Sequence, residues 1–291
     1  MSSIFVFPGQ GAQSVGMGKE LYENNTDARA VFDAVDAALG ENLSDIIFNG
    51  PSETLTLTAN VQPAIMATSI AMLRASGAKI PEYVAGHSLG EYTALCAAGA
   101  LSVGDTAKLL RVRGNAMQSS APAGAGLTAV ILGLDIDAVR EICAETDCDV
   151  ANDNSPGQVV ISGLRDVVEK TMEIAKERGA KRAMPLALSV PVHCRVQTPA
   201  ADAVRAAFEM VEFKTPVVPI ILNKTCTPTT DIDEIKDALV YQMTHGVRWR
   251  ESVLNMAELG ITEQIEVGPG NVLTGLCSRI TDKITAKKLE I

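Results

Sequence analysis

Residues 84–92 read VAGHSLGEY, in which Ser88 lies between glycines at positions 86 and 90. This Gly-x-Ser-x-Gly spacing is typical of a nucleophile elbow, where a strand turns abruptly into a helix and only small residues fit beside the serine. The turn would place the Ser88 hydroxyl at a helix N-terminus, where backbone N–H groups and the helix dipole stabilise a developing oxyanion. The alternative is that Ser88 is an ordinary cap of the helix that follows.

An activated serine needs a base, and the chain contains three histidines. His87 adjoins the serine, but neighbouring side chains of an elbow point apart. His245 lies in a polar stretch before Gly246. His193 lies in SVPVHC, where the chain is expected to re-enter a cleft, and we favour it as the base on that position. A purely structural histidine is the alternative.

The loop FPGQGAQ, residues 7–13, follows a short apolar run and contains two glycines. Glycines let the backbone approach a ligand closely, so this loop is a candidate for the second N–H donor of an oxyanion hole. A phosphate loop is disfavoured, because the Gly-Lys-Ser/Thr ending is missing and the glycines do not complete GxGxxG. A simple tight turn is the remaining interpretation.

Two arginines lie in the helical segment 103–120. Arg111 and Arg113 are two positions apart, so they face nearly opposite ways and at most one of them lines a given cleft. Arg113 shares its face with Met117, four residues later. A buried arginine there would suit two-pronged binding of a carboxylate, whereas a solvated surface charge is the alternative for either residue.

Residues 1–120 alternate short apolar runs with segments of helical periodicity, which favours a parallel α/β sheet with helices on both faces. The expected strands are 3–7 and 82–86, and the expected helices are 26–39, 61–76, 89–100 and 103–120. Two of these helices are expected to end at Gly40 and Gly77.

In residues 125–189 the expected strands and helices follow a different order, the β-α-β-β-α-β order of the ferredoxin-like split. The expected strands are 127–134, 148–153, 158–163 and 181–188, and the expected helices are 135–146 and 164–180. We therefore predict a small subdomain, 125–189, inserted into a larger α/β core of residues 1–124 and 190–291. The core then resumes with helices 199–211, 231–244 and 248–260 and strand 217–223, and residues 264–270 are expected to form a strand followed by a turn. A cleft between the two parts would be a natural active site.

The 291-residue chain is 47% hydrophobic and 21% charged, which indicates a globular protein. Its net charge of −10 argues against bulk nucleic-acid binding. No apolar run approaches the ~20 residues of a membrane span, and no secretory signal is evident. The six cysteines form no CxxC pair and the histidines lack metal-site spacing. We therefore expect a cytoplasmic protein with reduced thiols and no metal.

Seven segments together are far more specific than the elbow alone: FPGQGAQSVGMG, VQPA, AGHSLGEYTAL, RVRGNAMQ, NDNSPGQVVISG, SVPVHC and EVGPGNVLTGL. In this order they make the chain resemble the malonyl-CoA:acyl carrier protein transacylases of bacterial fatty acid biosynthesis. The resemblance implies a hydrolase-like parallel-sheet core with an inserted ferredoxin-like subdomain, in agreement with the pattern above. It also implies malonyl transfer from malonyl-CoA to the phosphopantetheine thiol of acyl carrier protein, by a ping-pong route through a malonyl-serine ester.

The resemblance further implies a role for each residue that matches the motifs of the family. Ser88 would be the nucleophile and His193 its base. A backbone carbonyl, matched here to Gln242, would orient the histidine. The backbone N–H groups of Gln10 and Leu89 would form the oxyanion hole.

The substrate pocket implied by the resemblance contains Arg113, which would pair with the free malonyl carboxylate and select malonate over acetate. Gln62, Met117 and His87 would line the pocket. No cofactor is implied, because malonyl-CoA is a substrate and the phosphopantetheine belongs to the carrier. The segment CRVQTPA after the histidine is unusual for the family, and Arg195 there is a candidate for altered docking or acyl preference.

Docking of an acidic carrier on an acidic chain requires a local basic patch. The candidates are Lys176, Arg178, Lys181 and Arg182, with Arg195 and Lys224 as others. A solvated helix end is the alternative interpretation. Three other functions remain open: a discrete acyltransferase of a polyketide pathway, a serine thioesterase or hydrolase, and a non-catalytic module that kept the fold. We expect a monomer with no nucleic-acid or membrane partner.

Overall fold

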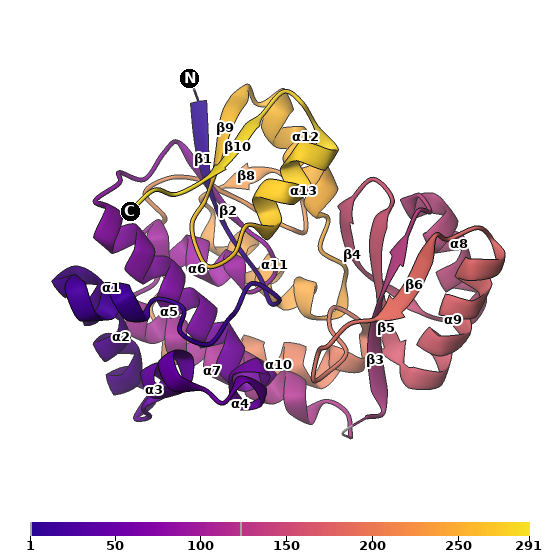
Figure 1. The fold of residues 1–291 in the computed structure, drawn as a ribbon, viewed down its shortest axis with the longest axis horizontal. Coiled ribbons are helices and arrows are strands. Elements are labelled where there is room, and N and C mark those ends of the chain that lie inside the picture. The colour runs from indigo at the N-terminus through magenta and orange to yellow at the C-terminus, as the bar shows by residue number, and fades with distance from the viewer. Residues whose placement is uncertain (1, 123) are drawn as a thin grey trace.

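The computed structural model describes residues 2–122 and 124–291, and a six-stranded sheet forms the centre of its larger part (Figure 1). In spatial order its strands are β10 (Thr285–Lys288), β9 (Ile261–Glu266), β1 (Ser2–Phe7), β2 (Tyr83–Gly86), β7 (Ile220–Ile221) and β8 (Pro228–Thr229). All neighbours are parallel except β7 and β8. Parallel strands need crossover connections, so helices cover both faces of this sheet.

The main hydrophobic core lies between one face of the sheet and most of the helices. These helices are α1 (Lys19–Asn24), α2 (Thr26–Leu39), α3 (Leu43–Asn49), α4 (Ser52–Thr56), α5 (Thr58–Ser76), α6 (Gly90–Ala97), α7 (Val103–Ser119), α10 (Thr198–Ala207) and α11 (Ile232–Thr244). Short 3₁₀ turns at Arg195–Gln197 and Phe208–Met210 flank α10. The opposite face is covered by α12 (Trp249–Glu258) and α13 (Val272–Ile280).

Strand β1 shows how the apolar run at residues 3–7 serves both faces. Phe5 and Phe7 join the main core, whereas Ile4 and Val6 join the second core beneath α12 and α13. This alternation follows from the two-residue period of a strand. A strand buried on both faces is continuously apolar, which is why the pattern SIFVF predicts it.

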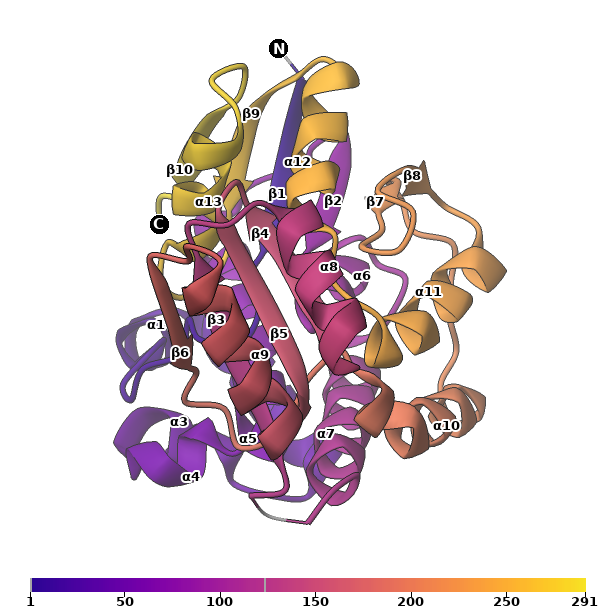
Figure 2. The same cartoon turned by 90° about the vertical axis from the view of Figure 1, so that its right-hand side faces the viewer.

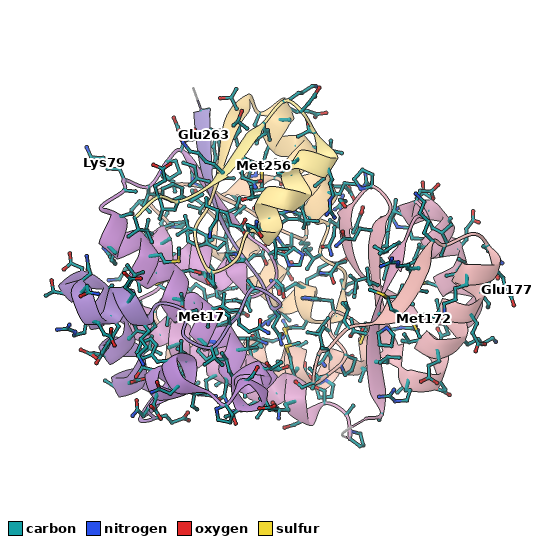
Figure 3. All side chains as sticks on the ribbon, in the orientation of Figure 1. Met17, Lys79, Met172, Glu177, Met256 and Glu263 are labelled. Carbon is teal, nitrogen blue, oxygen red and sulfur yellow. The ribbon has the colours of Figure 1, made fainter. Side chains whose placement is uncertain are left out.

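A separate four-stranded antiparallel sheet forms the smaller part, in the order β4-β5-β3-β6. Its strands are β3 (Gly126–Leu132), β4 (Asp149–Ser155), β5 (Gln158–Leu164) and β6 (Arg182–Pro185), and its helices are α8 (Ile136–Thr146) and α9 (Arg165–Glu177). Both helices cover the outer face of this sheet (Figure 2). Figure 3 labels one methionine in each of the three cores: Met17, Met256 and Met172.

The small sheet is fastened to the larger part at β4. Asn152 forms a parallel bridge with Val247, and the Asp153 N–H donates to the Val247 carbonyl at 2.9 Å. Arg250 of α12 pairs with the buried Asp153 carboxylate at 2.8 Å. These contacts fix the orientation of the small sheet, and with it the cleft between the two parts.

The predicted α/β architecture, a parallel-sheet core with a β-α-β-β-α-β subdomain, is confirmed. The limits 1–124, 125–189 and 190–291 stay a prediction, and residues 1 and 123 lie outside the described residues. Two expected strands are too long: 217–223 shrinks to β7 and 181–188 to β6. Proline lacks the N–H that continues a ladder, and Pro219 and Pro185 lie at these strand ends. Within residues 2–122 and 124–291, no helix has the length and apolarity to cross a membrane.

Helices α5 and α7 approach each other closely at Gly114. A Cβ atom there would lie 2.6 Å from Ala59 Cα and 2.7 Å from the Thr58 carbonyl oxygen. Both neighbours are backbone atoms, which cannot move aside as a flexible side chain can. This close approach places the adjoining residue, Arg113, against α5.

Gly114→Ala should therefore lower the melting temperature, because overpacking a core costs about 1–3 kcal/mol. Gly275→Ala is the matched control, since a Cβ at this helical glycine of α13 meets nothing within 4 Å. Alanine should raise helix stability slightly there. Thermal unfolding followed by circular dichroism measures both. Equal melting temperatures for the two variants would contradict the packing described here.

Candidate active site

The stretch VAGHSLGEY forms the sharp turn that its spacing predicts. Strand β2 ends at Gly86 and α6 begins at Gly90, and Ser88 between them has a φ of 56°. A Cβ on Gly86 would lie 1.9 Å from the Gly90 carbonyl carbon, and one on Gly90 would lie 2.2 Å from the Phe7 oxygen. Both positions therefore require glycine. Left-handed φ at a serine stores strain, which proteins tolerate chiefly at functional sites.

The hydroxyl of Ser88 meets His193 across 105 positions of sequence. Ser88 Oγ lies 2.7 Å from His193 Nε2, and His193 Nδ1 lies 2.5 Å from the backbone oxygen of Gln242. A carbonyl oxygen only accepts, so Nδ1 carries the proton and Nε2 is free to accept one from the serine. The histidine is thus oriented by a backbone carbonyl in the place that a carboxylate occupies in a serine triad.

His193 is buried, and it too has a left-handed φ, of 52°. Burial, together with the nearby Arg113 charge, lowers the pKa of His193 to about 3. The imidazole is therefore neutral at neutral pH, which is the form that a general base needs.

The other two histidines do not meet the serine. His87 Nε2 lies 2.9 Å from Asn154 Oδ1, and burial lowers the pKa of His87, so this ring is neutral and donates to the amide. His245 is exposed and stacks on Tyr241 with ring centroids 3.7 Å apart. Among the predicted candidates, His193 alone has the geometry of the base.

Arg113 is fully buried beside the serine, with 1% of its surface exposed. Its Nη1 donates to Gln62 Oε1 at 2.6 Å, and its Nη2 donates to Gln242 Oε1 at 2.8 Å and to Ser88 Oγ at 3.1 Å. Within residues 2–122 and 124–291, no carboxylate forms an ion pair with it. Its hydrogen-bond partners are all neutral, although the charge of the nearby Glu91 carboxylate also acts on it. Burying a cation that lacks a direct ion-pair partner is costly, and a ligand anion next to Ser88 would offset that cost.

Arg111 does not reach the serine, although it contacts α5 as Arg113 does. It pairs with Glu41 at 2.7 Å and donates to the Ala59 carbonyl at the same distance. Arg111 therefore links α7 to the N-terminal part of the chain, and Arg113 alone of the two adjoins the nucleophile.

A cavity of about 350 Å³ opens at the elbow, between the two parts of the molecule. Its lining consists of Gln10, Gly11, Gln13, His87, Ser88, Met117, Asn152, Asn154, Val160, Leu186, Ala187, Leu188, Val192 and His193. Met117 and His87 thus lie where the sequence places them. Neither Gln62 nor Arg113 belongs to this lining. Arg113 reaches the cavity only at Ser88 Oγ, and Gln62 contacts Arg113 and the sulfur of Met117, the latter at 3.3 Å.

One of the two predicted oxyanion donors, Gln10, lines this cavity, and the other, Leu89, is the residue that follows the nucleophile at the start of α6. Neither backbone N–H has an acceptor among the described residues, so both are free to bind a ligand oxygen. Two such donors next to a nucleophile–base pair are what acyl transfer requires.

Two further residues hold the elbow, and the sequence interpretation missed both. Asn223 Oδ1 accepts from the Ser88 N–H at 2.9 Å, and its Nδ2 donates to the Gly86 carbonyl at 2.7 Å. Glu91 is fully buried and accepts from the Asn223 N–H at 2.6 Å. A carboxyl within the otherwise apolar helix GEYTALCA is a signal that could have found Glu91. Asn223 had no comparable signal beyond its place after an apolar strand.

Three of the predicted carrier-docking cations are paired within the chain. Arg178 binds Glu145 at 2.6 Å, Arg195 binds Asp147 at 2.7 Å and Asp149 at 2.9 Å, and Lys224 binds Asp237. Lys176, Lys181 and Arg182 form no ion pair within the part of the chain that the structure describes. No group of three or more potential metal ligands occurs among those residues either.

Comparison with known proteins decides the family. The acyl transferase domain model matches residues 4–288. The malonyl CoA-acyl carrier protein transacylase of Bacillus subtilis is 44% identical over 98% of this chain and 92% of its own length. That of Escherichia coli K12 is 42% identical over 98% and 94%. This chain belongs to the malonyl CoA-acyl carrier protein transacylase family.

Solved structures of transacylases share the fold closely. The acyl-carrier-protein-S-malonyltransferase of Bartonella henselae has a TM-score of 0.96 at 48% identity, covering 99% of this chain and 95% of its own. A malonyl-transacylase in complex with a type II PKS acyl carrier protein also has a TM-score of 0.96, at 39% identity and with coverage of 99% and 96%. The family resemblance and the predicted fold are thereby confirmed.

A serine-directed organophosphonate should modify Ser88 of this transacylase, because His193 removes the hydroxyl proton. His193→Ala should slow the labelling by roughly 10²–10⁴-fold, the range of general-base catalysis. His245→Ala is the control and should label at the wild-type rate. Mass spectrometry of the intact protein and its peptides measures rate and position. Equal rates for the two variants, or a label on another residue, would contradict the assignment.

Proposed function

We propose that the protein transfers a malonyl group from malonyl-CoA to the phosphopantetheine thiol of acyl carrier protein, for fatty acid biosynthesis. The observation that carries the proposal is the buried guanidinium of Arg113, which lies 3.1 Å from the Ser88 hydroxyl and forms no direct ion pair with a carboxylate among the described residues. An acyl group with a free carboxylate fits such a site, whereas an uncharged acyl group leaves the cation unpaired. The names of the curated relatives support malonyl-CoA and acyl carrier protein as the substrates.

The first half-reaction loads the serine. Ser88 Oγ attacks the thioester carbonyl and its proton passes to His193 Nε2. The N–H groups of Gln10 and Leu89 donate to the oxyanion that forms. The carbon–sulfur bond then breaks, and the departing CoA sulfur takes the proton from His193. A malonyl-serine ester and free CoA result.

The second half-reaction reverses these steps with a different thiol. The phosphopantetheine sulfur of the carrier loses its proton to His193 and attacks the ester carbonyl. The serine–acyl bond breaks, and Ser88 Oγ regains the proton. Because one base serves both halves and the first product leaves before the carrier reacts, the kinetics are ping-pong. No cofactor takes part, since the phosphopantetheine arrives on the carrier.

Selection of the acyl group follows from Arg113. Three of its five N–H groups form the hydrogen bonds described above, and its Nε has no partner among the described residues. N–H groups therefore remain for the malonyl carboxylate while both glutamine partners are kept. We also propose that the protein acts in the cytoplasm, which its six buried, unpaired cysteines suit.

Two basic residues, Lys181 and Arg182, come shortly before the cavity-lining segment 186–188 in the sequence, and they suit the docking of an acidic carrier. Lys181 and Arg182 are exposed at the start of β6, an edge strand of the small sheet. The residues directly after β6, 186–188, line the cavity. A carrier held at β6 is thus near the opening through which its phosphopantetheine arm must reach Ser88.

Charge reversal at Lys181 and Arg182 should raise the KM for acyl carrier protein, because a local attraction is lost on a chain of net charge −10. Loading from malonyl-CoA should keep its rate. Lys79→Glu is the control, since Lys79 lies at the opposite end of the molecule from the small subdomain residue Glu177 (Figure 3). Steady-state kinetics with the carrier varied measure the effect. An unchanged KM in the double variant would contradict this docking surface.

Intact-protein mass spectrometry tests the function itself. After mixing with malonyl-CoA, the wild type should gain one malonyl group, and addition of holo acyl carrier protein should move that group to the carrier. Ser88→Ala should gain nothing, because the attacking oxygen is gone. Release of free malonate without an adduct or transfer would indicate a hydrolase instead. Faster transfer to a polyketide carrier than to a fatty acid carrier would assign the enzyme to a polyketide pathway.

A further inference from the structure

One buried ionisable group near the site has no part in the mechanism above. Glu91 lies in the first turn of α6 and has none of its surface exposed. Each of its two carboxylate oxygens accepts a hydrogen bond from a different segment of the chain. Burying a carboxylate is costly in free energy, so a buried Glu91 carboxylate indicates a structural or functional role at this position.

The first oxygen of Glu91 supports the nucleophile. Oε1 accepts from the backbone N–H of Asn223 at 2.6 Å. The side chain of Asn223 in turn binds both sides of the elbow, at the Gly86 carbonyl and the Ser88 N–H. Glu91 is therefore one residue removed from the backbone that holds Ser88 in its strained conformation.

The second oxygen supports the base and the arginine. Oε2 accepts from the side-chain Nε2 of Gln242. The backbone oxygen of Gln242 orients His193, and its side-chain oxygen accepts from Arg113 at 2.8 Å. Through Asn223 and Gln242, Glu91 thus connects to the nucleophile, to the base and to the carboxylate-binding group.

We propose that Glu91 is a positioning residue whose ionised carboxylate keeps Ser88, His193 and Arg113 in the reactive arrangement, so that protonating it switches transfer off. This inference rests on the proposed function. It adds a group that sets the acid limit of activity without touching the substrate.

The geometry explains why the ionised form is needed. Both partners of Glu91, the Asn223 N–H and the Gln242 amide NH₂, are donors, so both carboxylate oxygens must accept. A protonated carboxyl presents one O–H donor, which faces another donor and loses one of the two hydrogen bonds. Either Asn223 or the amide of Gln242 then shifts, and a misplacement of about 1 Å in such a site can cost roughly 10²-fold in rate.

The pKa of Glu91 places the change in its charge near neutral pH. Burial raises the pKa of Glu91 to about 7, while the hydrogen bonds from Asn223 and Gln242 and the charge of Arg113 oppose the rise. The other titratable groups around it are Tyr92 beside it on α6 and Cys226 after β7, and burial raises the pKa of both, so they stay neutral. His193 titrates far lower. Glu91 is therefore the group in this network that changes charge near neutrality.

The test is the pH dependence of kcat/KM for malonyl-CoA in the wild type, Glu91→Gln and Glu91→Asp. The wild type should lose activity about tenfold per pH unit below pH 7. Glu91→Gln should be roughly 10²-fold slower at pH 8 and should show no acid limb near 7, because its amide does not titrate. Glu91→Asp keeps a carboxylate and should keep the limb. Circular dichroism confirms that each variant is folded.

An acid limb that remains near pH 7 in Glu91→Gln would overturn the proposal, because another group would then be titrating. A wild type that transfers malonyl at pH 8 with no limb at all would also overturn it. No transfer by the wild type at any pH would instead contradict the proposed function. If the variants do not fold, carbon-13 NMR of wild-type protein with labelled glutamate decides: one carboxyl should titrate near pH 7, and ordinary titration of every glutamate would exclude the proposal.

Discussion

The buried charge of Arg113 is the constraint around which the site is built. A guanidinium out of water is unfavourable, and two glutamine side chains, from α5 and α11, together with the nearby charge of Glu91, offset only part of that cost. The close approach of α5 and α7 at Gly114 fixes the position of the arginine. We propose that an anion entering with the acyl group supplies further stabilisation, which would make burial of the cation a source of selectivity for a carboxylated substrate.

The reacting groups are held in strained conformations by parts of the chain that are distant in sequence. Ser88 and His193 both have left-handed backbones, and neither is a glycine. The elbow is locked by backbone contacts at Gly86 and Gly90, whereas the histidine follows the small sheet and reaches back to α11. Three separate segments therefore meet at one hydrogen-bonded pair. The packing of the surrounding cores offsets the free-energy cost of this backbone strain.

Much of this arrangement could be predicted from local pattern. The elbow follows from glycine spacing, the doubly buried β1 from a continuous apolar run, and the small sheet from its β-α-β-β-α-β order. The family motifs pointed to the backbone carbonyl of Gln242, which no side-chain chemistry reveals. Asn223 was beyond prediction, because long-range contacts decide its role. The start of β7 was placed too early, although Pro219 marks it in the sequence. Gln62 and Arg113 do not belong to the cavity lining, because their distance from the cavity depends on how α5 packs against α7.

The most direct measurement is the ratio of kcat/KM for malonyl-CoA to that for acetyl-CoA, in the wild type and in Arg113→Ala. Arg111→Ala serves as the control, since that arginine pairs with Glu41 and makes no contact with Ser88. Loss of a desolvated charge pair costs about 2–5 kcal/mol, so the ratio should fall by roughly 30-fold or more in Arg113→Ala alone. An unchanged ratio in Arg113→Ala, or an equal fall in both variants, would contradict the account.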